Sequence, residues 1–146
     1  MSVSLWIWSL LAGGVLALQV GMNGLLQTTT RSPLIAALIN FVVGTALLLV
    51  AALVTRAPWP DMTVVRGIPA WAWFGGSCGA LYVATVSFTG PRLGATTVLA
   101  LTLLGQSVVS LLVDHYGLVG LPVNPVSLTR VLGVLLLLGG ALLIAR

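Results

Sequence analysis

The stretch SPLIAALINFVVGTALLLVAALV, residues 32–54, contains no charged side chain and decides the class of fold. A serine followed by proline favours a helix start, because serine caps a free backbone N–H and the fixed φ of proline suits the first turn. At about 1.5 Å per residue, a helix of this length crosses the ~30 Å hydrocarbon core of a bilayer. We therefore predict a transmembrane helix over residues 33–54.

Four further apolar segments are long enough, or nearly so, to cross a bilayer. Of the 146 residues, 59% are hydrophobic and only 5% are charged, whereas soluble domains carry about 25% charged residues. In lipid only a helix satisfies its own backbone over such a segment. We predict an all-α integral membrane protein, one domain over residues 1–146, with transmembrane helices at about 5–26, 33–54, 68–88, 94–113 and 128–144. Gly90 and Pro91 are expected to close the third helix.

Composition also argues against several classes of function. The isoelectric point near 10.8 comes from single arginines at predicted loops and helix ends, so nucleic acid is not an expected partner. The lone Cys78 allows no intrachain disulfide, and the first twenty residues lack a basic region and a convincing cleavage site, which favours a retained helix over a signal peptide. We find no metal-ligand cluster, nucleophile–base pair or phosphate loop, and predict no enzyme activity, no metal and no cofactor.

The arginines divide evenly between the two predicted sides of the membrane. The chain has no lysine, and its six basic residues are Arg56, Arg66 and Arg130 on the side of the N-terminus and Arg31, Arg92 and Arg146 on the other. An excess of basic residues in short loops normally sets the orientation of a membrane protein. Three against three removes that bias, so we predict insertion in both orientations and pairing of opposite copies.

The tryptophans fall on one predicted side only. Trp6, Trp8, Trp59, Trp71 and Trp73, joined by Tyr116, form an aromatic belt on the side of the N-terminus. An antiparallel pair of chains would have such a belt at both membrane faces.

Amides on the first two predicted helices are candidates for contact with a solute. Gln19 and Asn23 lie four residues apart and share a face, and Trp8 returns to nearly the azimuth of Gln19. Asn40 lies near the centre of the second helix. One interpretation is the wall of a polar cavity with Trp8 as an apolar lid; the other is hydrogen bonding between helices for the amides and membership of the belt for Trp8.

The fourth predicted helix is the most polar. Gln106, Ser110 and Asp114 follow at intervals of four residues and drift only about 80° around the axis, which favours a cavity. Asp114 is a candidate for proton coupling, although a carboxylate at a helix end more often caps the helix or pairs with an arginine such as Arg130. No acid lies at mid-depth, and this disfavours cation–proton antiport through a buried carboxylate.

Together these residues resemble the YdcZ-type proteins, the five-helix bacterial branch of the drug/metabolite transporter superfamily. The resemblance rests on GGVLALQVGMNGLL (13–26), INFVVGT (39–45), GGSCGALYV (75–83), GPRLGA (90–95), GQSVVSLLVDHYGLVGLP (105–122) and RVLGVLLLLGGALLI (130–144). It implies the bacterial inner membrane and one half of a ten-helix inverted-repeat transporter. The residues it points to are Gln19, Asn23, Asn40, Gln106 and Asp114.

The sequence therefore predicts an antiparallel homodimer that acts as a secondary transporter, which could be an exporter, of a small polar or amphipathic metabolite or drug-like compound by alternating access. Its partners are a second copy, membrane lipid and the solute. Trp8 and Tyr82 would supply apolar walls, and Ser110 a hydroxyl, to the substrate site. A passive channel for a small neutral solute, or a non-transporting subunit that needs a paralogous partner, remain alternatives.

Overall fold

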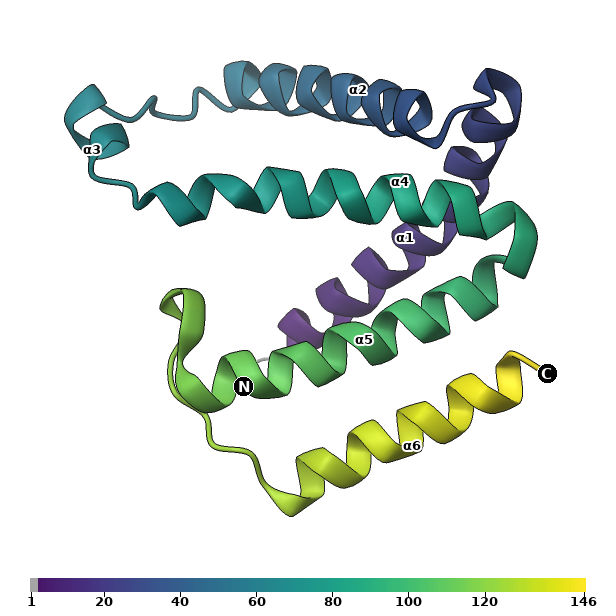
Figure 1. Ribbon diagram of the computed structural model, residues 1–146. Helices are drawn as coiled ribbons and strands as arrows, with labels where there is room; N and C mark the ends of the chain where they lie inside the picture. The colour runs from purple at the N-terminus through teal and green to yellow at the C-terminus, as the bar shows by residue number, and fades with distance from the viewer. Residues whose placement is uncertain (1–2) are drawn as a thin grey trace. The chain divides into compact units, whose positions relative to one another are not determined.

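The computed structural model describes residues 3–146, which are helical throughout except for short connections (Figure 1). Its elements in chain order are α1 (Val3–Thr30), α2 (Pro33–Val54), α3 (Met62–Arg66), the 3-10 helix η1 (Ala70–Phe74), α4 (Gly75–Leu93), α5 (Ala95–Tyr116), the 3-10 helix η2 (Leu118–Gly120) and α6 (Leu128–Ile144).

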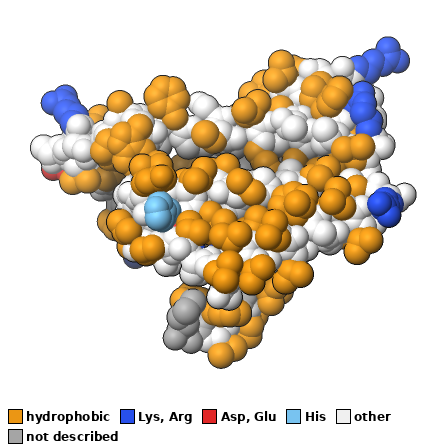
Figure 2. All heavy atoms as spheres, turned by 60° about the horizontal axis from the view of Figure 1, so that its bottom comes forward, with side chains coloured by type: hydrophobic (Ala, Val, Ile, Leu, Met, Phe, Trp, Pro, Cys, Tyr) orange, Lys and Arg blue, Asp and Glu red, His pale blue; other side chains and the backbone are white. Residues whose placement is uncertain are grey.

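Three of these helices, α1, α2 and α5, are long and apolar enough to cross a membrane, and α6 is a shorter apolar helix of 17 residues. Large apolar side chains along all of them are exposed. Figure 2 shows the same property, with hydrophobic side chains spread over the visible face and arginines at a few isolated places. Such a surface requires lipid or protein around it and not water. The expected all-α membrane class is confirmed.

The helices group into two compact units. One contains residues 3–21 and 89–146, and the other contains residues 22–88, so the boundary passes inside α1 and inside α4. The expectation of a single five-helix domain stays a prediction.

In the first unit, α5 lies along α6, and α1 crosses α4 at Val20 and Gly90. Val20 is only 3% exposed, and a Cβ atom built on Gly90 would lie 2.9 Å from its Cγ1 atom. The absent side chain at Gly90 is therefore what lets the two helices approach so closely.

In the second unit, α2 contacts α4 through an aromatic ring set against a glycine. A Cβ atom on Gly79 would lie 3.3 Å from the Cζ atom of Phe41. Ala36 and Ala37 on α2 and Val83 and Val86 on α4 are buried. Small residues thus form much of the buried part of this unit, as is common where membrane helices pack.

Two predicted helix starts are confirmed by their caps. Ser32 precedes α2 and its side chain accepts a hydrogen bond from the Ile35 N–H at 3.3 Å, with Pro33 in the first turn. Ser127 precedes α6 and accepts from the Arg130 N–H at 3.3 Å. Each serine satisfies one of the backbone donors that a helix start leaves free.

Besides α4, two helices extend beyond their predicted ends. α1 continues to Thr30, because Thr28 and Thr30 donate their hydroxyls to the carbonyls of Leu25 and Leu26, and so their polar groups are satisfied by the helix itself. α5 ends at Tyr116 and not at 113, where Gly117 adopts a left-handed conformation with φ of 61°.

The expectation that Gly90 and Pro91 close the third helix is wrong. A 3-10 turn, η1, leads into α4, and α4 runs through Pro91 to Leu93. A proline removes only one backbone bond in the last turn of a helix, and the helix ends instead at Gly94. With φ of 80° and ψ of 152°, Gly94 has a backbone conformation that suits glycine almost alone. The region read as one loop between the second and third predicted helices also contains the short helix α3.

Candidate functional site

A groove of about 460 Å³ runs along the C-terminal half of α5, within the first unit. It is lined by Gly105, Gln106, Val109, Ser110, Val113, Asp114 and Leu121. The six residues from α5 follow at intervals of one, three and four and therefore share one helix face. Leu121 comes from the segment between α5 and α6. The predicted polar face of Gln106, Ser110 and Asp114 is thus one wall of a real groove.

Gln106, Ser110 and Asp114 line the groove, but the surface that faces it is almost entirely apolar. The Gln106 side chain is exposed, so its amide can both donate and accept. The Ser110 hydroxyl donates to the Ser107 carbonyl at 3.0 Å and can still accept a hydrogen bond. An apolar groove with polar side chains on the same helix can hold a molecule with both polar and apolar parts.

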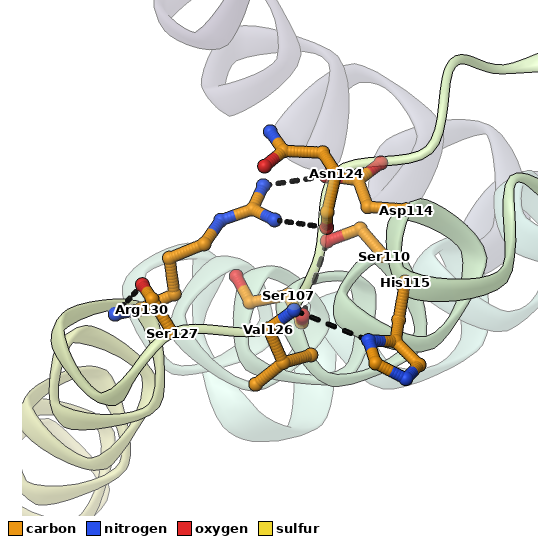
Figure 3. A network of polar contacts seen from close by, with 8 residues as sticks. All are labelled: Ser107, Ser110, Asp114, His115, Asn124, Val126, Ser127 and Arg130. Carbon is orange, nitrogen blue, oxygen red and sulfur yellow. Dashed lines mark hydrogen bonds and ion pairs between the residues drawn. The ribbon is translucent and has the colours of Figure 1, made fainter.

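Asp114 is not a free acid. Its Oδ2 atom accepts from the Arg130 Nη2 atom at 2.5 Å, and Arg130 Nη1 donates to the Asn124 carbonyl at 3.1 Å (Figure 3). The Asp114 and Arg130 side chains are 26% and 33% exposed. The predicted pairing of Asp114 with Arg130 is confirmed, and its role in coupling stays a prediction.

His115, the next residue, holds the same connecting segment by a contact that sequence reasoning missed. Its Nδ1 atom accepts a hydrogen bond from the Val126 N–H at 3.2 Å, and its ring meets the Tyr116 ring edge-on at 4.7 Å. The two partners are eleven residues apart across an irregular turn, so no periodic pattern indicates that they meet. The only available signal was that this is the one histidine of the chain.

The other predicted residues of the first unit lie away from this groove's lining. Gln19 is half-buried on α1, and Trp8 is 70% exposed. Trp8 therefore has the exposure of a lipid-facing or headgroup-level side chain, while its predicted contact with a solute stays a prediction.

In the second unit, Asn23 differs from every other polar side chain. It is 1% exposed, and neither its Nδ2 nor its Oδ1 atom has a hydrogen-bond partner among residues 3–146. Asn40 and Tyr82 are half-buried on α2 and α4. A buried amide without partners costs free energy, so Asn23 is either strained in the single chain or completed by another molecule.

Comparison with known proteins gives a match to a family model. No curated protein and no solved structure is significantly similar to the chain. A family model described as "Putative inner membrane exporter, YdcZ" matches residues 4–143, nearly the whole chain. The exposed apolar helices, the groove with an amide and a hydroxyl, and this match agree with one another. The chain belongs to the YdcZ family that this description names and is a helical protein of the inner membrane.

Proposed function

We propose that the chain is one half of a secondary transporter that exports a small polar or amphipathic solute by alternating access. The observation that carries the proposal is the groove on α5. It places Gln106, Ser110 and Asp114 on a helix long enough to span the membrane, between apolar walls. A polar stripe on such a helix is costly against lipid and belongs at a solute path.

Five spans per chain follow if α4 and α6 also cross the bilayer. α4 has 19 residues and α6 has 17, which correspond to lengths of about 28 and 25 Å at 1.5 Å per residue. Both values are near the ~30 Å of the hydrocarbon core, and η1 extends α4 at its start. An odd number of spans leaves the two chain ends on opposite sides.

The second half of the transporter would be an identical copy inserted the other way. The arginines support this arrangement, since five spans leave three of them on each side. The tryptophans also support it, because all five expose more than half of their surface, as side chains of a headgroup belt do. Two opposed copies form an inverted repeat, the architecture on which many transporters build alternating access.

The residues proposed for solute contact are Gln19, Asn23, Asn40, Gln106 and Ser110, with Trp8 and Tyr82 as apolar walls and Asp114 as the coupling candidate. Asn23 supports a site that the single chain leaves incomplete, because its buried amide needs a partner. A solute, a water molecule or the second copy would supply it.

The groove is tested by flux through proteoliposomes, with a panel of labelled neutral and zwitterionic solutes. Ser110→Ala should raise the KM for a transported solute about threefold to tenfold, the range of one lost hydrogen bond. Ser107→Ala is the matched control, because its hydroxyl donates to the Leu103 carbonyl at 2.7 Å outside the groove lining. Flux that only follows the gradient of the solute itself would identify a passive channel and defeat the transporter proposal.

The pairing of opposite copies is tested by two arginine variants with the same local effect. Arg31 and Arg56 both lie just past a helix end, with φ of 55° and 51°, where glycine is the preferred residue. Arg31→Gly and Arg56→Gly therefore relax the same kind of strain but remove a charge from opposite sides. Each alone should orient the chains one way and lower flux, and co-expression of the two should restore it. Equal flux from either variant alone would contradict the antiparallel pair.

A further inference from the structure

The segment between α5 and α6 is held against the end of α5 by a compact set of polar contacts. Asp114 contributes its carboxylate to Arg130 and its carbonyl to the Asn124 N–H at 2.8 Å. His115 accepts from the Val126 N–H, and Arg130 reaches back to the Asn124 carbonyl. Figure 3 shows these groups turned toward one another at the end of α5. Two neighbouring side chains, Asp114 and His115, are thus the anchor points of the segment.

The two side-chain contacts depend on acceptors without an added proton, whereas the backbone carbonyl of Asp114 accepts from the Asn124 N–H in either case. A carboxylate accepts the bond from a guanidinium, whereas a protonated carboxyl loses the charge that strengthens the bond. The Nδ1 atom of His115 accepts from the Val126 N–H only in the neutral tautomer that carries its proton on Nε2. Protonation places an N–H where the acceptor was, opposite another N–H, and this contact becomes repulsive.

Asp114 and His115 are two of the three acidic or histidine side chains of the chain. The sequence has two acidic residues and one histidine, so only Asp61 lies outside the pair. The groups facing them are Arg130 from α6 and Tyr116 on α5 itself, and residues 117–127 contain no titratable side chain. The part of α1 in the same unit, residues 3–21, contains none either. Within this unit, the acidic and histidine side chains are therefore confined to the end of α5 that holds this segment.

The segment is also strained in its anchored form. Val119 has φ of 50°, a conformation that a β-branched residue adopts only at a cost. Gly117 and Gly120 on either side have φ of 61° and 78°. Strain of this kind persists only where surrounding contacts impose it, so loss of the anchors favours release.

Release would change the groove, because the segment supplies Leu121 to its lining. Leu121 lines the groove together with Gln106 and Ser110. We propose that residues 117–126 form a proton-operated strap over this groove, closed while His115 is unprotonated and released when it takes up a proton. The proposal rests on the proposed function only in taking the groove as a solute path. It names the proton as the species that controls access to it.

The test follows hydrogen exchange of single backbone amides in the full chain in lipid nanodiscs. Protection is taken relative to the intrinsic exchange rate at each pH, so the pH dependence of exchange itself cancels. Imidazole is the side chain whose unperturbed charge change falls between about pH 5 and 8. Protection of the Val126 amide should therefore fall by about tenfold or more from pH 8 to pH 5.5. The Val98 amide, bonded to the Gly94 carbonyl at 3.2 Å, is the control and should not change.

Two variants distinguish the contribution of the His115 side chain from that of the Asp114 side chain. His115→Asn keeps an acceptor near the position of Nδ1 but does not titrate, so Val126 protection should become independent of pH. Asp114→Asn keeps the backbone carbonyl that accepts from the Asn124 N–H, so a fall in Asn124 protection at pH 8 would report the lost charged contact with Arg130, while Val98 protection reports that the helices remain folded. Unchanged Val126 protection in the original chain, or the same fall in His115→Asn, would overturn the strap. Exchange needs no solute, so a strap that opens in a chain without flux would refute the proposed function and leave the strap standing.

Discussion

The crossing of α1 and α4 gives a quantitative prediction at Gly90. A Cβ atom there would lie 2.9 Å from the Val20 Cγ1 atom and 3.5 Å from the Val20 carbonyl oxygen. Two carbon atoms pack best at about 3.5–4.0 Å, so the helices must separate by about 0.6–1.1 Å to admit one methyl group. Overpacking of this kind costs about 1–3 kcal/mol. Gly90→Ala should therefore destabilise the first unit.

A matched variant removes the effect of helix propensity, because alanine in place of glycine stabilises a helix by about 1 kcal/mol on its own. Gly14 lies in α1 of the same unit, and a Cβ atom there meets nothing within 4 Å. Gly14→Ala and Gly90→Ala should differ by about 1–3 kcal/mol in the free energy of unfolding. The measurement is reversible unfolding in mixed micelles of increasing SDS fraction, followed by tryptophan fluorescence.

A double-mutant cycle identifies the contact itself. Val20→Ala removes the Cγ1 atom that the new methyl group would meet, so Gly90→Ala should cost about 1–3 kcal/mol less in the Val20→Ala background than alone. If Gly14→Ala and Gly90→Ala are equally stable, or if the cost at Gly90 is unchanged by Val20→Ala, the close crossing is refuted.

Three further variants test other local features by the same unfolding measurement. Gly117→Ala should lower the free energy of unfolding by more than about 1–2 kcal/mol, because φ is 61° and a Cβ atom would lie 2.7 Å from the Val123 Cγ2 atom. An unchanged free energy of unfolding would contradict the left-handed end of α5. Ser32→Ala should cost about 1 kcal/mol through loss of the cap on α2, and a change near zero would mean that the Ile35 N–H finds another partner. Asn23→Leu removes a buried amide without partners, so it should leave the free energy of unfolding unchanged or higher while lowering flux. A loss of more than about 2 kcal/mol in that free energy would show that the amide is hydrogen-bonded.

The helices could be predicted because membrane spans depend on length and hydropathy, and both properties can be read from a continuous stretch of sequence. The cap at Ser32 is likewise a local pattern of serine and proline, and the structure confirms it. Asp114 and Arg130 could be paired in advance because few charged residues were available at that side of the membrane. The structure places three of the predicted site residues, Gln106, Ser110 and Asp114, in one groove.

What the sequence did not predict depends on contacts between distant residues or on single backbone conformations. Proline at position 91 indicated a helix end, yet the helix continues because the local backbone tolerates one lost bond and ends at Gly94. The acceptor role of His115 depends on the path of an irregular turn. The burial of Asn23 depends on how helices cross, which no periodicity within α1 indicates.

The junction between α4 and α5 consists of one residue, and this limits where the chain can be cut or extended. The Gly94 N–H donates to the Gly90 carbonyl at 2.9 Å, and its own carbonyl accepts from Val98, so the end of α4 and the start of α5 are both bonded to this one residue. A fluorescent protein or a rigid marker domain for electron microscopy inserted there would break a terminal hydrogen bond of one or both helices. The exposed, extended stretch at residues 57–61, which joins α2 to α3, has no such shared bond and is the natural place for such an insertion.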